Sequence, residues 1–357
     1  MFKNLDYPII FLTVAIFAIG IMFQYSVSYQ KDVATIHNPA VKQLIWLLIG
    51  FLVFAFVLKV GYRRILSGSY FFYGAVLVLL AAVFLFGRQR FGAQRWLQFG
   101  IFNIQPSEFT KLSLILTLAY YLGRRSDRVL RIKNFLVPFF LTAIPAVLIL
   151  KQPDLGTALV LFPIFMSIIY ILGTEIKYII GFIGVCILSF PFFWHLLRPY
   201  QKARLLVFVN PNTDPLGAGY TIVQSKIAVG SGRFFGKGWL SGTQNYLNFL
   251  PERHTDFIFS VVGEEWGFVG SVILLALYFL LINRMLRILD MTENVYGRLL
   301  IAGIVTMLFL QVVVNIGMTI GIFPVVGITL PLISYGGSSL LTTFIGIAIV
   351  LSVHQER

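Results

Sequence analysis

The sequence contains few charged residues and only one cysteine. Charged residues occupy 12% of its 357 positions and hydrophobic residues 58%, whereas a soluble domain is about half apolar and a quarter charged. The single cysteine, Cys186, excludes an intramolecular disulfide and a cysteine metal cluster. The shortage of charge argues against a soluble domain, and the lipid bilayer is the expected solvent.

Acidic residues are the scarcer of the two charge types. Asp and Glu number 14 against 28 Lys and Arg, so the net charge is +14. In a soluble protein this balance would indicate a nucleic-acid partner. Here the basic residues lie in short segments between apolar runs, where membrane orientation is the better explanation. We therefore expect contact with membrane lipid and no nucleic-acid partner.

Apolar runs recur along the whole chain, and a helix of roughly 20 apolar residues spans the hydrocarbon core. The runs cover about 8–28, 41–58, 69–86, 107–123, 134–150, 157–172, 178–197, 262–283, 299–318 and 334–353. They predict an all-α integral membrane protein with about ten transmembrane helices in one polytopic domain, residues 1–357. The first run shows no convincing cleavage site, so we expect a retained helix.

The distribution of basic residues predicts the orientation. With the N-terminus inside, fourteen basic residues fall on the cytoplasmic side and six in short outward segments, which favours two cytoplasmic termini. One connection, about 198–260, is much longer than the others and falls on the outer face. It contains side chains such as Phe234, Phe235 and Trp239, too apolar for a solvated linker. We expect this loop to fold back onto the helix bundle.

Ionisable residues beside the apolar runs mark candidate functional sites, because charge at membrane depth is expensive. Arg95 precedes a polar stretch in which Glu108 and Lys111 stand three residues apart, on one helix face. These two residues could equally form a structural ion pair. In a second cluster, Asp154 could cap the following helix, and capping alone would explain it.

A third cluster lies where the long loop meets the eighth run. It contains Arg253, His254 and Asp256, followed by Glu264 and Glu265. Asp256 either caps the following helix or takes part in a chemical reaction. His254 is interpreted as a polar interface residue rather than a metal ligand, because no second histidine lies nearby.

The fourth cluster is a pair of apolar segments interrupted by Gly and Pro between Asn315 and Ser339. Non-helical backbone at membrane depth must line a cavity or be buried in protein, so a broken-helix site is one interpretation. Ordinary packing of small residues is the other.

Several cations fall on the outward side, where the positive-inside rule gives no reason for them. They are Arg88, Arg90, Arg95, Arg198, Lys202, Arg204, Lys226, Arg233, Lys237 and Arg253. A phosphate or pyrophosphate ligand at the outer leaflet would account for them. The alternative is a solvated loop surface.

At these residues the chain resembles the SEDS family of cell-wall polymerases (shape, elongation, division and sporulation) over nearly its whole length. The resemblance is carried by Gly92–Trp96, Gln105–Glu108, Gln152–Thr157, Pro251–Ser260 and Leu330–Ser339. The stretch from Lys237 to His254 is similar to the rod-shape elongation branch rather than the division branch.

The resemblance implies a ten-helix fold that polymerises lipid II, the undecaprenyl-pyrophosphate-linked disaccharide pentapeptide, into glycan strands. The reaction would take place at the outer face of the cytoplasmic (inner) membrane, during cell elongation. A class B penicillin-binding protein, a single-span transpeptidase that crosslinks the strands and activates the polymerase, is the implied partner.

The residues fit this chemistry, because glycosyl transfer from a pyrophosphate donor needs a carboxylate base and cations for the leaving group. Asp256 matches the family's essential aspartate and is expected to deprotonate the acceptor 4-hydroxyl, giving a β-1,4 linkage by inversion. The expected substrate-binding residues are Arg95, Glu108, Lys111, Asp154, Arg204, Lys226, Arg253 and Ser334. Glu108 is expected to pair with Lys111. A divalent cation, Mg or Mn, could assist the pyrophosphate, although no ligand set demands one.

Two other functions stay open at this point. A flippase for lipid II would use the same helices and cations without a base, and would still transport its lipid after loss of Asp256. A non-catalytic scaffold for the transpeptidase would tolerate loss of Asp256, Arg204 and Lys111 together. Neither explains the outward acidic and basic clusters as economically as an enzyme does.

Overall fold

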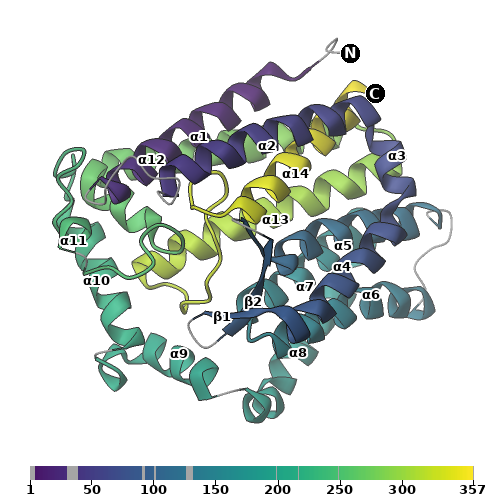
Figure 1. The fold of residues 1–357 in the computed structure, drawn as a ribbon. Helices are drawn as coiled ribbons and strands as arrows, with labels where there is room; N and C mark the ends of the chain where they lie inside the picture. Colours follow the sequence, from purple (N-terminus) through teal and green to yellow (C-terminus); the bar gives the residue numbers. More distant parts are fainter. Residues whose placement is uncertain are drawn as a thin grey trace.

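The computed structural model describes residues 5–29, 39–90, 93–99, 102–125, 132–197, 199–215, 217–247 and 249–356. Its described residues confirm the predicted all-α class with ten long helices (Figure 1). These are α1 (Tyr7–Ser28), α2 (Pro39–Val60), α4 (Ser69–Phe86), α5 (Pro106–Gly123), α6 (Ile132–Lys151), α7 (Leu155–Ile171), α8 (Ile176–Leu196), α12 (Ile258–Met291), α13 (Val295–Ile320) and α14 (Gly337–Gln355).

Length and composition allow six of the described helices to cross a membrane. They are the helical stretches Tyr7–Ser28, Val41–Val60, Ser69–Phe86, Ile258–Met291, Val295–Ile320 and Gly337–Gln355. Three shorter apolar helical stretches lie in α6, α7 and α8. Large apolar side chains such as Phe71 and Leu188 are 85% and 83% exposed, which is expected of surfaces that face lipid.

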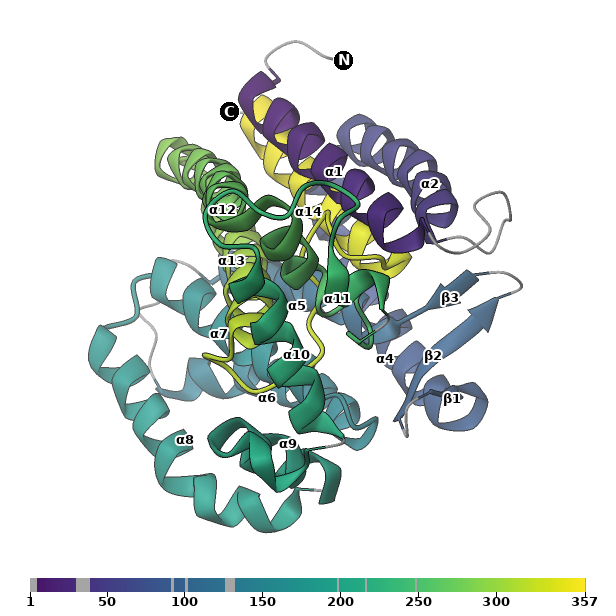
Figure 2. The same cartoon turned by 90° about the vertical axis from the view of Figure 1, so that its left-hand side faces the viewer.

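Helix α13 lies at the centre of the bundle. It packs against α5, α7, α12 and α14, and its buried residues include the polar side chains of Gln311 and Asn315. Helix α14 packs along α2, and α1 packs along α12. The start of α1 and the end of α14 lie at the same end of the molecule in both views (Figures 1 and 2), as an even number of spans requires.

A small antiparallel sheet, not predicted from the sequence, lies between α4 and α5. Its strands are β1 (Arg88–Arg90), β2 (Ala93–Phe99) and β3 (Phe102–Ile104), in the order β1-β2-β3. Residue Leu97 of β2 pairs with Ile104 of β3. The sheet projects from one side of the bundle (Figure 2), and β2 carries Arg95. A short helix, α3 (Tyr62–Ser67), between α2 and α4 was also not predicted.

The long connection is largely helical and folds back onto the bundle, which confirms that prediction. It contains α9 (Pro199–Val209), the 3-10 turn η1 (Pro211–Thr213), α10 (Ala218–Ser231) and α11 (Thr243–Tyr246). Helix α10 packs against α12 and α13. These elements lie at the end of the molecule opposite to the start of α1 and the end of α14 (Figure 1).

Helix α12 begins earlier than predicted, at Ile258, and is interrupted at Gly267, whose φ of 65° favours glycine. The interruption frees backbone groups, and the segment 233–238 bonds to them. Lys237 N donates to Glu264 O at 3.0 Å, and Phe268 N donates to Arg233 O at 2.9 Å. The long connection therefore stabilises the first half of α12 in its position.

Candidate active site

Asp256 lies in the turn of residues 251–257, directly before α12. We call this segment the Asp256 turn. A Cβ atom placed on Gly327 would lie 3.4 Å from Asp256 Oδ2 and 3.9 Å from Arg95 Nη1, so both side chains lie close to this glycine. Gly327 belongs to the α13–α14 loop, residues 321–336, and its φ of 74° favours glycine. Asp256 does not cap α12, because Phe257 occupies that position and no side chain caps the helix.

The electrostatic surroundings of Asp256 suit a base that works near neutral pH. Burial raises the pKa of its carboxyl to about 6, and the neighbouring Glu252 adds to the rise, while Arg204 and Arg95 oppose it. Among the described residues, none donates a hydrogen bond to the carboxylate. The side chain is still partly exposed. The carboxylate oxygens are therefore available to accept a proton from a substrate.

Arg95, whose charge acts on Asp256, is bonded to the start of α7. Its Nη1 atom lies 3.8 Å from Asp154 Oδ1, and its guanidinium also donates to the carbonyl of Pro153. Asp154 caps α7 by accepting from Thr157 N at 3.3 Å, which confirms the predicted cap. It also accepts from Ser107 Oγ at 3.2 Å. Asp154 thus fixes a guanidinium at the site as well as a helix terminus.

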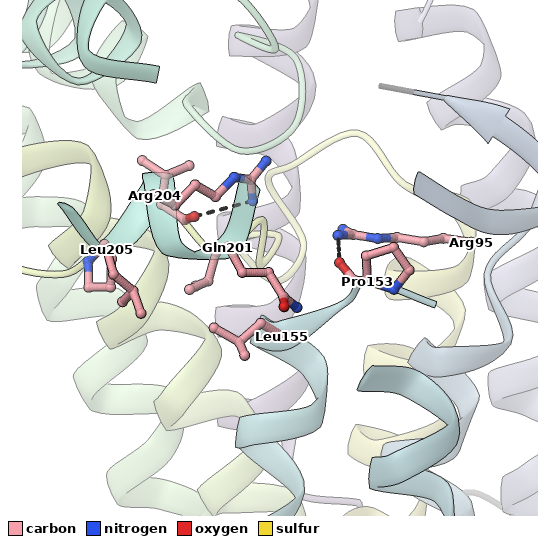
Figure 3. Close-up of a pocket in the computed structure, with 9 residues that line it drawn as sticks. Arg95, Pro153, Leu155, Gln201, Arg204 and Leu205 are labelled. Atoms are coloured by element: carbon pink, nitrogen blue, oxygen red, sulfur yellow. Dashed lines mark hydrogen bonds between the residues drawn. The ribbon is translucent and has the colours of Figure 1, made fainter. Parts of the chain in front are cut away.

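A small pocket, with about 10 Å³ of free space, adjoins this cluster. Its lining residues are Arg95, Pro153, Leu155, Gln201, Arg204, Leu205, Pro324, Val325 and Val326. Figure 3 shows Arg95 and Arg204 on opposite sides of the pocket, with Gln201 and Leu155 between them. Arg204 Nη1 donates to Val325 O at 3.2 Å. Two guanidinium groups therefore line one small pocket, and guanidinium is a strong hydrogen-bond partner for phosphate oxygens.

The sequence did not point to Gln201, although a signal for it exists. Gln201 stands three residues before Arg204 in α9, so both side chains share one helix face.

The apolar wall of the pocket, formed by Pro324 to Val326, lies in the Gly/Pro-interrupted segment. Residues 321–336 of that segment are non-helical and include this wall of the pocket, as the broken-helix interpretation requires, whereas its ends lie in α13 and α14.

Glu108 and Lys111 form the predicted ion pair on α5, with 2.8 Å between Glu108 Oε1 and Lys111 Nζ. Both side chains are buried. The charges that act on Asp256 are those of Glu252, Arg204, Arg95 and Asp154, and this pair is not among them. The structure therefore shows an intrahelical ion pair, and a direct role in substrate binding remains a prediction.

Three further predicted residues have distinct surroundings. Lys226 is exposed on α10, and its side chain lies against Gly321 at the C-terminus of α13, where a cation is favoured. Arg253 is only 5% exposed, and burial lowers the pKa of its guanidinium. Ser334 Oγ donates to Thr255 O at 2.6 Å, so its hydroxyl contacts the Asp256 turn.

Glu264 and Glu265 are buried on α12, in a separate cluster. Glu264 Oε1 accepts from Lys237 Nζ at 2.7 Å, from Thr243 Oγ1 at 3.0 Å and from Gln244 N at 3.1 Å. Glu265 Oε1 accepts from Ser26 Oγ at 2.5 Å. These bonds join the segment 237–244 and the end of α1 to the first half of α12.

A resident metal would need a set of ligands. Across the described ranges, no group of three or more His, Cys, Asp or Glu side chains lies close enough to hold a metal ion. Two carboxylates interact with the Arg95 guanidinium: that of Asp154 at 3.8 Å and that of Asp256 through its charge. Arg95 and Arg204 are the cationic side chains among the residues that line the pocket.

Comparison with known proteins connects this geometry to a family. The family model FTSW_RODA_SPOVE, described as "Cell cycle protein", matches residues 7–357. The chain is 46% identical over 289 residues to the peptidoglycan glycosyltransferase MrdB of Escherichia coli K12, covering 80% of this chain and 78% of MrdB. It is 34% identical to the peptidoglycan glycosyltransferase RodA of Treponema pallidum, covering 99% of this chain and 98% of that protein.

Solved structures give the same result for the fold. A chain from a peptidoglycan synthase complex, studied for the structural coordination of polymerisation and crosslinking, superposes with a TM-score of 0.85. It is 35% identical, and the match covers 99% of both chains. The similarity therefore extends over the helices, the long connection and the α13–α14 loop together.

Proposed function

This chain belongs to the FTSW_RODA_SPOVE family of cell cycle proteins, and we propose that it is a peptidoglycan glycosyltransferase that polymerises lipid II into β-1,4-linked glycan strands. The observation that carries the proposal is the position of Asp256. Its carboxyl, with a pKa raised to about 6, feels the charges of Arg95 and Arg204, the two cations that line the pocket. Such a base and two cations are what transfer from a pyrophosphate donor requires.

The reaction assigns one task to each group. Asp256 accepts the proton of the acceptor 4-hydroxyl while that oxygen attacks the anomeric carbon of the donor sugar. The bond between that carbon and the pyrophosphate oxygen breaks, and undecaprenyl pyrophosphate leaves with the electron pair. Attack from the face opposite the leaving group converts an α-linked donor into a β-1,4 linkage.

The guanidinium groups of Arg95 and Arg204 are proposed to stabilise the negative charge that grows on the departing pyrophosphate. Lys111 and Arg253 are proposed as further cations for this group, with Glu108 organising Lys111. A divalent cation, Mg or Mn, could supply additional charge if it arrives with the pyrophosphate. Chelation with EDTA tests this: loss of polymer that added Mg restores would show a metal requirement.

The chain is a multi-pass membrane protein, and we propose the cytoplasmic (inner) membrane with both termini in the cytoplasm. This orientation places the Asp256 turn and the pocket at the outer face, where lipid II is polymerised. The proposed partner is a class B penicillin-binding protein. The match to a chain of a peptidoglycan synthase complex supports such a partner.

The test is polymerisation of labelled lipid II by the purified protein together with a cognate transpeptidase. Wild-type protein and an Asp256→Ala variant are compared after equal folding and equal complex formation have been verified. We expect glycan strands from the wild type and none from the variant. Absence of strands from both proteins, or equal strands from both, would contradict the assignment. Transport of lipid II without polymerisation would favour a flippase instead.

A further inference from the structure

Three consecutive main-chain carbonyls of the Asp256 turn each accept a hydrogen bond from outside the turn. His254 O accepts from Gln24 Nε2 at 2.8 Å. Thr255 O accepts from Ser334 Oγ at 2.6 Å, and Asp256 O accepts from Asn315 Nδ2 at 3.0 Å. The three donors come from α1, the α13–α14 loop and α13, so separate parts of the fold converge on the turn.

The same three side chains also bond to the α13–α14 loop. Gln24 Nε2 donates its second hydrogen bond to Ile333 O at 3.0 Å, and Asn315 Nδ2 donates to Ile328 O at 2.7 Å. Ser334 Oγ accepts from Leu330 N at 2.8 Å. Each side chain therefore bridges the turn that carries Asp256 and the loop that contains Gly327 and lines the pocket.

Burial makes these bridges obligatory. Gln24 and Asn315 are 0% exposed and Ser334 is 4% exposed, so water cannot replace a lost donor. The amide oxygens of Gln24 and Asn315 have no hydrogen-bond partner among the described residues. What both positions use is thus the NH₂ group, which can donate to two carbonyls at once.

We propose that Gln24, Asn315 and Ser334 are positioning residues, which fix the Asp256 carboxylate relative to Arg95 and the pocket through the main chain. The inference rests on the proposed function and adds to it the residues that place the base. No described side chain bonds to the carboxylate, so its position depends on the turn. A misplacement of about 1 Å at a reacting group can lower the rate by about 10²-fold.

The test uses the full-length protein with its transpeptidase partner and labelled lipid II. Asn315→Ala removes the donor to Asp256 O, and Gln311→Met is the matched control. Gln311 lies one turn away on α13, is 1% exposed, and its amide has no partner among the described residues. We expect kcat of Asn315→Ala to fall by about 10- to 100-fold, with KM for lipid II changed less than about three-fold. The control should keep both values.

Two measurements separate positioning from simple loss of folding. The pH at which kcat is half-maximal should shift in Asn315→Ala, because the Asp256 carboxylate moves relative to the charges around it. Those charges are Glu252, Arg95, Arg204 and Asp154. A smaller folded fraction would leave that pH unchanged. If Asn315→Ala does not fold, Ser334→Ala provides the same test, and Ser334→Thr, which keeps the hydroxyl, should restore kcat. Wild-type kcat and pH midpoint in folded Asn315→Ala and Ser334→Ala would overturn the proposal.

Hydrogen exchange gives a readout independent of catalysis. The amides of Thr255 and Phe257 donate to Glu252 O within the turn, and we expect both to exchange at least ten-fold faster in Asn315→Ala than in Gln311→Met. Unchanged exchange would overturn the proposal even if activity fell. If the wild type forms no strands, the proposed function itself fails and the catalytic role of the three residues fails with it, whatever the exchange rates.

Discussion

Asp256 lies directly before α12 and Glu264 lies in the second turn of that helix. The surroundings of the two carboxylates differ sharply. Glu264 is 0% exposed and accepts three hydrogen bonds, one from the Lys237 ammonium. Asp256 is partly exposed, accepts no hydrogen bond from a described residue, and has its pKa raised to about 6. Glu264 is paired with a lysine through its Oε1 atom, although its Oε2 atom has no hydrogen-bond partner among the described residues, whereas Asp256 accepts no hydrogen bond from them at all.

The difference between Glu264 and Asp256 shows which carboxylate the described residues leave without a hydrogen-bond donor. A buried carboxylate without partners is costly, so a fold selected for stability alone would pair it. Glu264 has that pairing, and its bonds hold the segment 237–244 against α12. Asp256 has no such hydrogen bonds from the described residues, and the charges of Arg95 and Arg204, which line the pocket, act on it. We therefore expect substitutions at Glu264 to affect stability and substitutions at Asp256 to affect catalysis.

The largest expected effect separates these two carboxylates directly. Asp256→Asn keeps the shape of the side chain but removes the base, so kcat should fall by about 10²- to 10⁴-fold with little change in thermal midpoint. Glu264→Gln replaces a charged acceptor of Lys237 by an amide, so the thermal midpoint should fall while kcat per folded molecule stays within about three-fold. Lipid II polymerisation and thermal unfolding of both variants are the measurements.

The opposite pattern would contradict the comparison. A large loss of kcat in well-folded Glu264→Gln would show that the second carboxylate takes part in the reaction. Retained activity in Asp256→Asn would remove the base from the mechanism.

Arg204 tests whether the cations at the pocket act on the leaving group. Arg204→Ala should lower kcat by about 10²-fold, in the lower part of the range for removal of one electrostatic donor, because Arg95 remains. Arg204→Lys keeps the charge but not the planar fork, and should recover part of the rate. Steady-state kinetics with lipid II measures both. Equal activity of Arg204→Lys and Arg204→Ala would argue that the charge is not what Arg204 supplies.

Substitution of Lys237 tests how much its ion pair with Glu264 contributes to stability. Lys237→Met leaves Glu264 buried without its cation, which costs about 3–5 kcal/mol in a fully buried pair. The Lys237 side chain is 27% exposed and two other donors to Glu264 remain, so we expect about 1–2 kcal/mol. Thermal or denaturant unfolding of the purified protein measures the loss. An exposed pair, Lys177 with Glu175, provides the matched control, since Lys177→Met should have almost no effect.

The sequence could predict much of this arrangement because apolar runs and charge report directly on the bilayer. The ten long helices follow from hydropathy, and the Glu108–Lys111 pair and the Asp154 cap follow from helical spacing. The early start of α12 at Ile258 did not follow, because the apolar run begins only at about 262, and the Asp256 turn before the helix is held by bonds from α1, α13 and the α13–α14 loop.

Long-range placement is what the sequence could not supply. Nothing near Arg95 in the chain indicates that a small sheet carries it to Pro153 and Asp154. Gln24 is over 200 residues from the turn that it bonds to. Such contacts depend on how distant helices pack, and hydropathy and spacing along a single chain do not encode that packing in a readable form.

The smallest expected effect concerns the pH dependence of the base. Glu252 is exposed, and its negative charge helps to raise the pKa of Asp256 to about 6. As the proposed base, Asp256 is active as the carboxylate, so kcat/KM should rise with pH through about 6. Glu252→Gln removes a charge that disfavours the carboxylate, so the rise should move to lower pH by roughly a few tenths of a unit.

The matched control for this shift is Glu356→Gln. Glu356 pairs with Arg63 just past the C-terminal end of α14, so its substitution removes the same charge and should leave the pH midpoint of kcat/KM in place. The measurement is kcat/KM for lipid II across pH 5 to 8 for the three proteins. A shift to higher pH in Glu252→Gln would mean that Glu252 supports the carboxylate instead of opposing it. An equal shift in both variants would reflect net charge alone, because a local field on Asp256 acts through Glu252 and not through a glutamate at the opposite end of the bundle.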